Sequence, residues 1–92
     1  MKWLEIIELR FGGNDSKMLK SKLYKLLETV ENSEIKVYSH VNVKTDFSIH
    51  LTHYSEKADR SGSPLGQHLV STLKEFGLVN HNVWVKLEND KS

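Results

Sequence analysis

The sequence predicts an α+β sandwich in which two helices cover one face of a four-stranded antiparallel sheet. Three observations lead to this fold class: runs of alternating apolar residues, stretches with apolar residues at helical spacing, and the order strand–helix–strand occurring twice in succession. The expected strands are residues 2–11, 34–43, 46–54 and 79–87. The expected helices begin near residue 14 and at residue 64.

The first helix follows a pair of glycines. Gly12 and Gly13 interrupt the first strand, and Asn14, Asp15 and Ser16 are each good N-terminal caps. Apolar side chains then recur at helical spacing, at Leu19, Leu23, Leu26, Leu27 and Val30. The lysines of this segment lie off that stripe, so we expect them to face solvent.

The second helix, residues 64–76, has clear signals at both ends. Ser63 is a cap, Pro64 suits the first helical position, and Gly77 is a typical stop signal. Its apolar stripe is Leu65, Leu69, Leu73 and Phe76. A glycine inside a helix costs about 1 kcal/mol relative to alanine. We therefore expect a neighbouring segment to pack closely against Gly66.

The connection between the second and third strands is predicted from the alternation of side chains. Residues that face each other in an antiparallel pair point to the same side of the sheet. A three-residue connection, 44–46, meets this requirement and pairs Val43 with Phe47 and His40 with His50. A five-residue connection also meets it, but shorter connections are more common. We therefore expect two imidazoles opposite each other across the ladder.

The face of the sheet away from the helices is expected to mix aromatic, aliphatic and polar residues. For this element order we expect the first and third strands to be central and to run parallel, with Trp3, Ile7, Leu9 and Phe11 facing the helices. The other face then collects Leu4, Ile6, Tyr38, His40, His50, Tyr54 and Trp84 among Glu8, Arg10, Lys36, Asn42, Ser48, Thr52 and Lys86. Such a mixture is typical of an interface or of the floor of a ligand site.

This composition predicts a homodimer that pairs through the sheet face. It also predicts that the chain binds a small ligand or a partner there, with Tyr38, His40, His50 and Trp84 as the ligand-binding residues. A chain of 92 residues buries only about 60–65% of its unfolded surface, so covering this face with a second copy would add stability.

A second candidate region is an anion site at the starts of the two helices. If the first and third strands run parallel, both strand-to-helix connections lie at the same edge of the sheet. Helix N-termini there would present unpaired amides. The expected anion-binding residues are Gly13, Asn14, Arg60 and Ser63, and the corresponding function is a regulatory module that senses a small anion. Against it, Ser63 can cap its own helix, and neither connection has the Gly-x-x-x-x-Gly-Lys pattern.

No motif identifies catalytic residues, and the residues do not decide whether the chain is an enzyme. The chain has no cysteine and no Gly-x-Ser-x-Gly sequence. His40 and His50 could share a metal ion with Glu8 as a third ligand, but zinc sites normally have three or four protein ligands and no His-x-x-x-His spacing supports one, so we expect no metal and no cofactor. We expect His53, His68 and His81 to be structural polar groups.

The composition indicates one soluble domain. We expect residues 1–88 to form it and residues 89–92 to be a short polar tail. The formal net charge of +1, with both signs interspersed, favours neither a nucleic acid nor a membrane as partner. The lack of cysteine fits a reducing compartment, and we expect a cytoplasmic protein.

The strand order and the half-apolar open face resemble the dimeric α+β barrel superfamily of ferredoxin-like domains, whose best-known members are the antibiotic-biosynthesis monooxygenases. The segments 62–69 and 76–85 also resemble small uncharacterised prokaryotic proteins of about this length. The resemblance implies two subunits packed sheet against sheet. It also implies an alternative function, cofactor-independent monooxygenase chemistry on an aromatic substrate. It assigns no catalytic residue.

Overall fold

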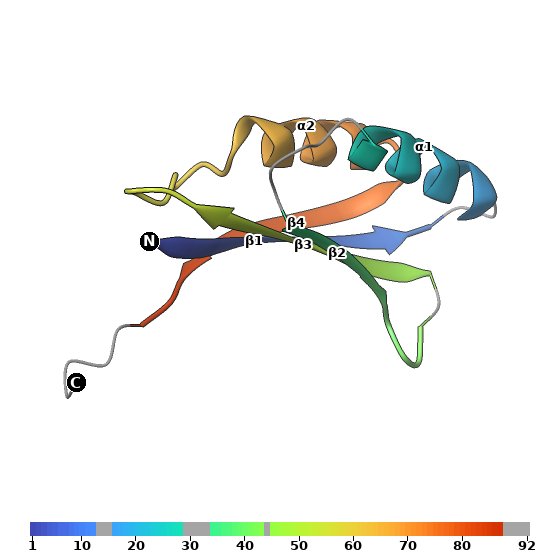
Figure 1. Cartoon of the computed structure of the whole chain (residues 1–92). Helices are drawn as coiled ribbons and strands as arrows, with labels where there is room; N and C mark the ends of the chain where they lie inside the picture. Colours follow the sequence, from blue (N-terminus) through green and yellow to red (C-terminus); the bar gives the residue numbers. More distant parts are fainter. Residues whose placement is uncertain (13–15, 29–33, 44, 88–92) are drawn as a thin grey trace.

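The structure is a computed structural model that describes residues 1–12, 16–28, 34–43 and 45–87. Its elements are β1 (Lys2–Phe11), α1 (Ser16–Glu28), β2 (Glu34–Ser39), β3 (Asp46–Tyr54), α2 (Pro64–Leu73) and β4 (Gly77–Val85). The four strands form one antiparallel sheet in the order β2-β3-β1-β4. Both helices lie on the same face of that sheet (Figure 1). The chain therefore has a ferredoxin-like α+β fold, as the sequence predicted.

The two central strands run antiparallel, so the expectation that they are parallel is wrong. Lys2 lies opposite Tyr54 and Arg10 lies opposite Asp46. The reason is topological. The crossover through α1 returns the chain parallel to β1, and the hairpin then reverses it, so β3 must oppose β1. The carboxyl ends of β1 and β3 consequently lie at opposite ends of the sheet.

The register of the β2–β3 hairpin also differs from the prediction. Tyr38 lies opposite Ser48, and Lys36, instead of His40, lies opposite His50. Relative to the predicted register the pairing is displaced by four residues. Because this displacement is even, each side chain in β2 stays on the predicted side of the sheet.

The hairpin register changes because the chain bends after Ser39. The backbone N–H of His40 donates to the carbonyl of Asp46 at 2.9 Å, and Asp46 N–H donates to the carbonyl of Val43 at 3.0 Å. The His40 ring nitrogen Nδ1 accepts the N–H groups of Asn42, at 3.0 Å, and Val43, at 3.2 Å. These local hydrogen bonds compete with the extended ladder, so β2 ends at Ser39.

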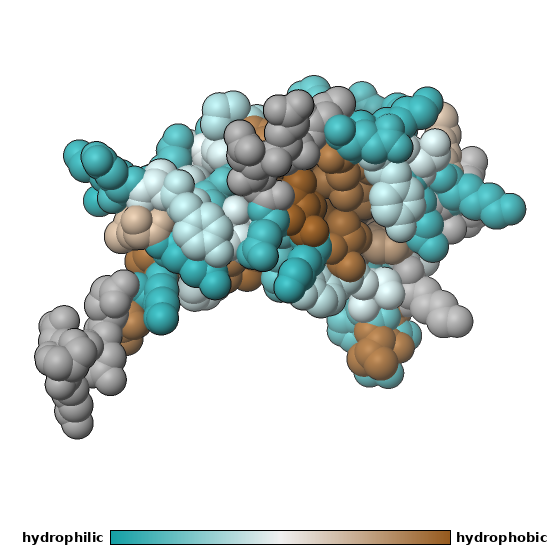
Figure 2. All heavy atoms as spheres, viewed as in Figure 1, coloured by the Kyte–Doolittle hydropathy of each residue, from teal (hydrophilic) through white to brown (hydrophobic). Residues whose placement is uncertain are grey.

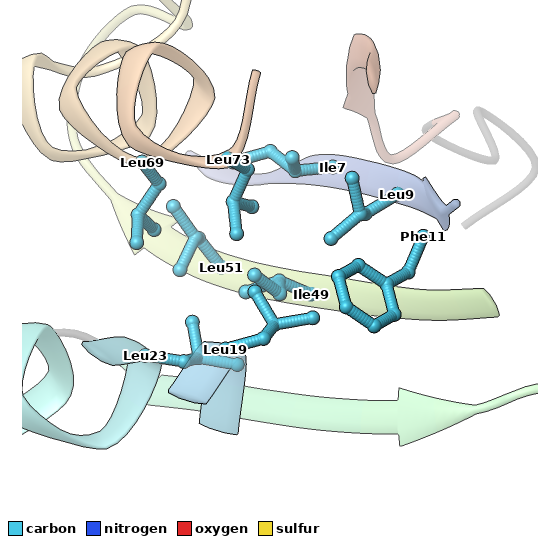
Figure 3. Packing of buried hydrophobic residues seen from close by; sticks show 9 residues of the cluster. All are labelled: Ile7, Leu9, Phe11, Leu19, Leu23, Ile49, Leu51, Leu69 and Leu73. Atoms are coloured by element: carbon cyan, nitrogen blue, oxygen red, sulfur yellow. The ribbon is translucent and has the colours of Figure 1, made fainter. Parts of the chain in front are cut away.

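The core lies between the helices and the inward side of the sheet. It consists of Ile7, Leu9, Phe11, Leu19, Leu23, Ile49, Leu51, Leu69 and Leu73. Figure 3 shows these side chains pointing toward one another from β1, β3 and both helices. Figure 2 shows apolar residues gathered between the two layers. Removing this surface from water, at roughly 25 cal/mol per Å², holds the layers together.

The second helix begins as the sequence predicted. Ser63 is its N-cap and accepts the N–H of Gly66 through Oγ at 3.0 Å, and Pro64 occupies the first helical position. The helix ends at Leu73, and Gly77 is already the first residue of β4. Among the described residues, no helix is long and apolar enough to cross a membrane.

Candidate functional site

The side of the sheet opposite the helices is an uncovered face with an apolar end. Figure 1 shows both helices above the sheet and none of the described elements below it. At this end Trp84 lies opposite Leu4 and is 57% exposed. Ile6 follows on β1 and is partly buried, and Tyr54 is 67% exposed. We call Leu4, Ile6, Tyr54 and Trp84 the apolar end of the open face.

A hollow with a mixed polar and apolar lining lies at the other end of the open face, beside the β2–β3 connection. Its volume is about 660 Å³. It is lined by Glu8, Leu9, Arg10, Tyr38, Ser39, His40, Asp46, Phe47, Ser48, Leu78, Val79 and Asn80. Both signs of charge line it, and the guanidinium of Arg10 approaches the carboxylate of Asp46 at 4.0 Å. We call this the hairpin hollow.

The four residues predicted to bind a ligand do not meet at one point. Tyr38 and His40 line the hairpin hollow. The ring of His50 packs against Tyr38 with the centroids 4.7 Å apart, and its Nε2 bonds Ser48 Oγ at 2.9 Å. Trp84 lies beside Leu4, four residues along β1 from the hollow's Glu8. That separation is about 13 Å at the rise of a strand.

The anion site predicted at the two helix starts depends on the direction of the strands. Gly13 and Asn14 lie outside the described residues, in the segment that follows β1. Arg60 and Ser63 follow β3. Because β1 and β3 are antiparallel, the two connections leave from opposite ends of the sheet. The prediction that both helix starts meet at one edge is therefore wrong.

The structure reveals a cluster that the sequence analysis missed, centred on Glu5. Glu5 is on the helix-facing side of β1 and is 0% exposed. Its Oε1 accepts the Nε2–H of His53 at 2.6 Å and the backbone N–H of Ser63 at 2.9 Å. Its Oε2 accepts the Nε2–H of His81 at 2.7 Å. One carboxylate thus joins β1, β3, β4 and the start of α2.

Register places the two histidines on either side of this carboxylate. Glu5 itself lies opposite Leu51 and Val83. His53 lies opposite Trp3, and His81 lies opposite Ile7, so each histidine is diagonal to Glu5 across a ladder. Side chains at such diagonal positions point to the same side of the sheet and are within reach of each other.

Two glycines make room for the cluster. A Cβ at Gly66 would overlap the carboxylate of Glu5, which confirms the prediction that a neighbour packs closely against this helical glycine. Gly62 has a positive φ of 88°, and a Cβ there would overlap the ring of His81. Both positions therefore admit only glycine while the cluster keeps this geometry.

An aromatic side chain covers the His53 side of the cluster. The Trp3 and His53 ring centroids are 4.3 Å apart, and Trp3 is 5% exposed. Trp3 Nε1–H donates to Ser55 Oγ at 2.9 Å, and Ser55 Oγ–H donates to the carbonyl of Lys57 at 2.7 Å. These bonds hold the segment after β3 against the sheet.

The environment keeps Glu5 ionised. Burial of the carboxyl raises the pKa of Glu5, because the charge loses its hydration. Hydrogen bonds from Ser63, His81 and His53 to the charged form outweigh this effect and leave the pKa of Glu5 below its ordinary value. A carboxylate can only accept hydrogen bonds, so Nε2 of both histidines must carry a proton. The cluster is therefore a charged acceptor with three donors arranged around it.

The cluster has the residue types of a metal site but a different geometry. In the described part of the chain, no group of three or more His, Asp or Glu side chains is arranged to hold a metal ion. The ring nitrogens that would ligate an ion point at the oxygens of Glu5 at hydrogen-bond distance.

Two signals in the sequence pointed to the cluster. Glu5 lies between Trp3 and Ile7 among the alternate residues of the first strand that face the helices. A single acidic side chain among buried apolar ones requires hydrogen-bond donors. In residues 46–54, His53 shares its side of the strand with Phe47, Ile49 and Leu51, so the alternation places it on the same inward side.

Comparisons with family models, curated proteins and solved structures gave no match to this chain.

Proposed function

We propose that the chain is a small ligand-binding module that acts as a homodimer, with a second copy covering the apolar end of the open face. The observation that supports this most directly is the layout of that face. At one end the exposed aromatic rings of Tyr54 and Trp84 lie beside the partly buried Leu4 and Ile6, and at the other end lies a hollow lined by charged, polar and apolar residues. The first suits burial by protein, and the second suits a ligand.

A second copy is the occupant that this face fits best. A two-fold axis through the open face would bring the apolar end of one copy against the same surface of another, and such self-complementary pairing is the commonest form of oligomer. The resemblance to the dimeric α+β barrel superfamily supports the same sheet-to-sheet arrangement. A cysteine-free chain is also compatible with the cytoplasmic location proposed for this dimer.

The hairpin hollow suits a small polar ligand. Its volume of about 660 Å³ falls within the range of about 300–1,000 Å³ that is usual for ligand sites. Arg10 offers donors, Glu8 and Asp46 offer acceptors, and Tyr38 offers an aromatic ring that is 48% exposed. We propose that His40 and Tyr38 contact the ligand directly, while His50 supports the ring of Tyr38 from β3.

Light scattering tests the dimer. We expect the mass of two chains at micromolar concentration, and Trp84→Glu should weaken association at least about tenfold, because a charge would enter the apolar end. Lys20→Glu, on the exposed side of α1, is the matched control and should leave the dimer intact. A monomeric native chain at every accessible concentration would refute the dimer.

A thermal-shift screen tests the ligand site separately. Amino acids, quinones and phosphorylated metabolites are added to the native chain, since a ligand that binds only the folded state raises Tm. A ligand of the hairpin hollow should lose its effect in Tyr38→Ala and His40→Ala but keep it in Lys20→Glu. A ligand whose effect survives both substitutions binds elsewhere and contradicts this assignment.

A further inference from the structure

We propose a second binding site, independent of the open face, in which His81 and Arg60 bind a small oxyanion that still carries a proton. Inorganic phosphate in its singly charged form is the simplest such ligand. In this site Arg60 supplies the positive charge, and Nδ1 of His81 accepts a hydrogen bond from the O–H of the ligand. Glu5 is a positioning residue that determines which ring nitrogen of His81 is the acceptor.

The site is a hollow at the free edge of the sheet. Its volume is about 400 Å³, and it is lined by Ala58, Arg60, His81, Asn82, Val83 and Val85. β4 is an outer strand of the sheet, and the segment between β3 and α2 supplies the other wall. A hollow of this size admits an ion such as phosphate together with its hydration.

The wall that carries Arg60 is held in place by local hydrogen bonds. Gly62 N–H donates to the carbonyl of Asp59 at 3.0 Å, and Ser61 N–H donates to Asp59 Oδ1 at 3.0 Å. Gln67 Nε2–H donates to the carbonyls of Ser61 and Gly62 at 3.2 and 3.3 Å. Arg60 thus projects from an ordered turn, and its exposed side chain is available to a ligand.

The hydrogen bonds of the cluster leave Nδ1 of His81 accessible. The ring uses Nε2 to bond Glu5, and among the described residues Nδ1 makes no hydrogen bond. No buried side-chain nitrogen or oxygen in that part of the chain lacks a partner, so Nδ1 must reach the surface. The side chain of His81 is 19% exposed, which agrees with this conclusion.

The tautomer of His81 follows from its partner. Glu5 is ionised and only accepts hydrogen bonds, so the proton of a neutral His81 ring resides on Nε2. Nδ1 then carries the lone pair and is an acceptor in the hollow. An O–H of the ligand can donate to it while a second ligand oxygen accepts from the guanidinium of Arg60. If the ligand transfers its proton to Nδ1, His81 becomes an imidazolium, and this cation lies between two anions, the ligand and Glu5.

Charged and titratable groups lie on both sides of the ring. Glu5 from β1 and, beyond its carboxylate, His53 from β3 belong to the cluster, while Arg60 and its neighbour Asp59 lie in the exposed turn, where Asp59 Oδ1 accepts the N–H of Ser61. The negative charge of Glu5 is shared among three donors, so the positive charge nearest the ligand is that of Arg60.

Nitrogen-resolved NMR of the histidine rings, with inorganic phosphate as the probe, tests the proposal. In the native chain without phosphate, we expect Nε2 of His81 to be protonated and Nδ1 to be unprotonated. Phosphate should shift the ring signals of His81 in a saturable manner. Arg60→Gln should weaken this binding at least about tenfold while leaving the tautomer unchanged. In a parallel titration, acetate should bind more weakly than phosphate, because ionised acetate has no O–H to donate to Nδ1.

Glu5→Gln gives a sharper test, because the geometry predicts which histidine responds. Oε1 of Glu5 accepts from both Ser63 N–H and His53, so the amide oxygen of glutamine must occupy that position. Its NH2 group then faces Nε2 of His81, which must become an acceptor, and the ring proton moves to Nδ1. We expect the tautomer of His81 to change and that of His53 to stay. Glu8→Gln, on the open face of the same strand, is the matched control and should change neither.

Three results would overturn the proposal. The first is a native His81 whose proton is on Nδ1. The second is the absence of any phosphate-dependent shift of His81 at millimolar concentrations, or a shift with acetate as large as that with phosphate, since ionised acetate has no O–H to donate to Nδ1. The third is binding of equal strength in the native chain and in Arg60→Gln, which would identify an adventitious ion only. None of these results depends on the dimer or on the hairpin hollow.

Discussion

Glu5 and Glu8 lie three residues apart on β1 and have opposite environments. Glu5 faces the helices, is 0% exposed, and accepts hydrogen bonds from His53, His81 and Ser63. Glu8 is exposed and lines the hairpin hollow on the other side of the sheet. The same residue type is a structural centre in one region and a solvated group in the other.

The histidines differ in the same way between these two regions. His53 and His81 are oriented by a buried carboxylate through Nε2. His40 instead accepts backbone N–H groups of its own turn, and His50 bonds the hydroxyl of nearby Ser48. The backbone N–H groups only donate, so they fix Nδ1 of His40 as an acceptor, just as the carboxylate fixes a proton on Nε2 of His53 and His81. The hydroxyl of Ser48 both donates and accepts, so it does not determine the tautomer of His50. The comparison assigns stability to the Glu5 cluster and adaptability to the hairpin hollow.

The largest expected effect is that of removing the buried carboxylate. Glu5→Leu leaves the Ser63 N–H and two imidazole N–H groups without their acceptor, so the free energy of unfolding should fall by about 3 kcal/mol or more. Glu8→Leu, on the open face, should change it by no more than about 0.5 kcal/mol. Urea denaturation measures both. Equal losses in the two variants would remove the distinction between the regions.

A smaller loss is expected when alanine replaces Gly66. In an unconstrained helix this change stabilises by about 1 kcal/mol. Here the added methyl group would overlap the Glu5 carboxylate, so we expect a loss of about 2 kcal/mol. Ser71→Ala, at an exposed position of the same helix, should be neutral or slightly stabilising. A stabilised Gly66→Ala variant would mean that the cluster shifts easily.

The smallest effect is expected in the response to acid, and its sign follows from the lowered pKa of Glu5. The folded state keeps Glu5 charged at a pH where the unfolded chain takes up a proton. The stability gained from ionised Glu5 is thus complete above the unfolded value of about 4.3 and is lost as the pH falls through the lower folded pKa. The difference in unfolding free energy between the native chain and Glu5→Gln should shrink over that range. For Glu8→Gln, a pH-independent difference is the expected control, and a Glu5→Gln difference that grows in acid would contradict the assigned direction.

Local patterns were enough to predict much of the fold. The bounds of β1 and β3 and the cap and first residue of α2 agree with the sequence prediction. The inward side of β1 was also correct at Trp3, Ile7, Leu9 and Phe11. The hairpin register was not predictable in this way, because a displacement by four residues preserves every side-chain direction, and the bend at His40 depends on its contacts with residues 42, 43 and 46.

The candidate sites were harder to predict than the fold, because they depend on contacts between residues that are far apart in the sequence. Gly66 indicated a close neighbour, and alternation placed His53 on the inward side, but neither observation identified Glu5 as the group that they share. The geometry assumed for the predicted anion site was wrong for a related reason. It assumed a strand direction, and the direction of β3 relative to β1 decides which connections meet.

By itself the sequence determined the order of the helices and strands and, in β1 and β3, which side of the sheet the residues face, because the periods of 2 and 3.6 residues are properties of neighbouring positions. Only the tertiary structure decided that Glu5 meets His53, Ser63 and His81, which are 48, 58 and 76 positions away along the chain. Strand order, direction and register decide which of these distant residues meet. Apolar burial favours the layered fold as a whole, and the buried charge then selects the partners that neutralise it.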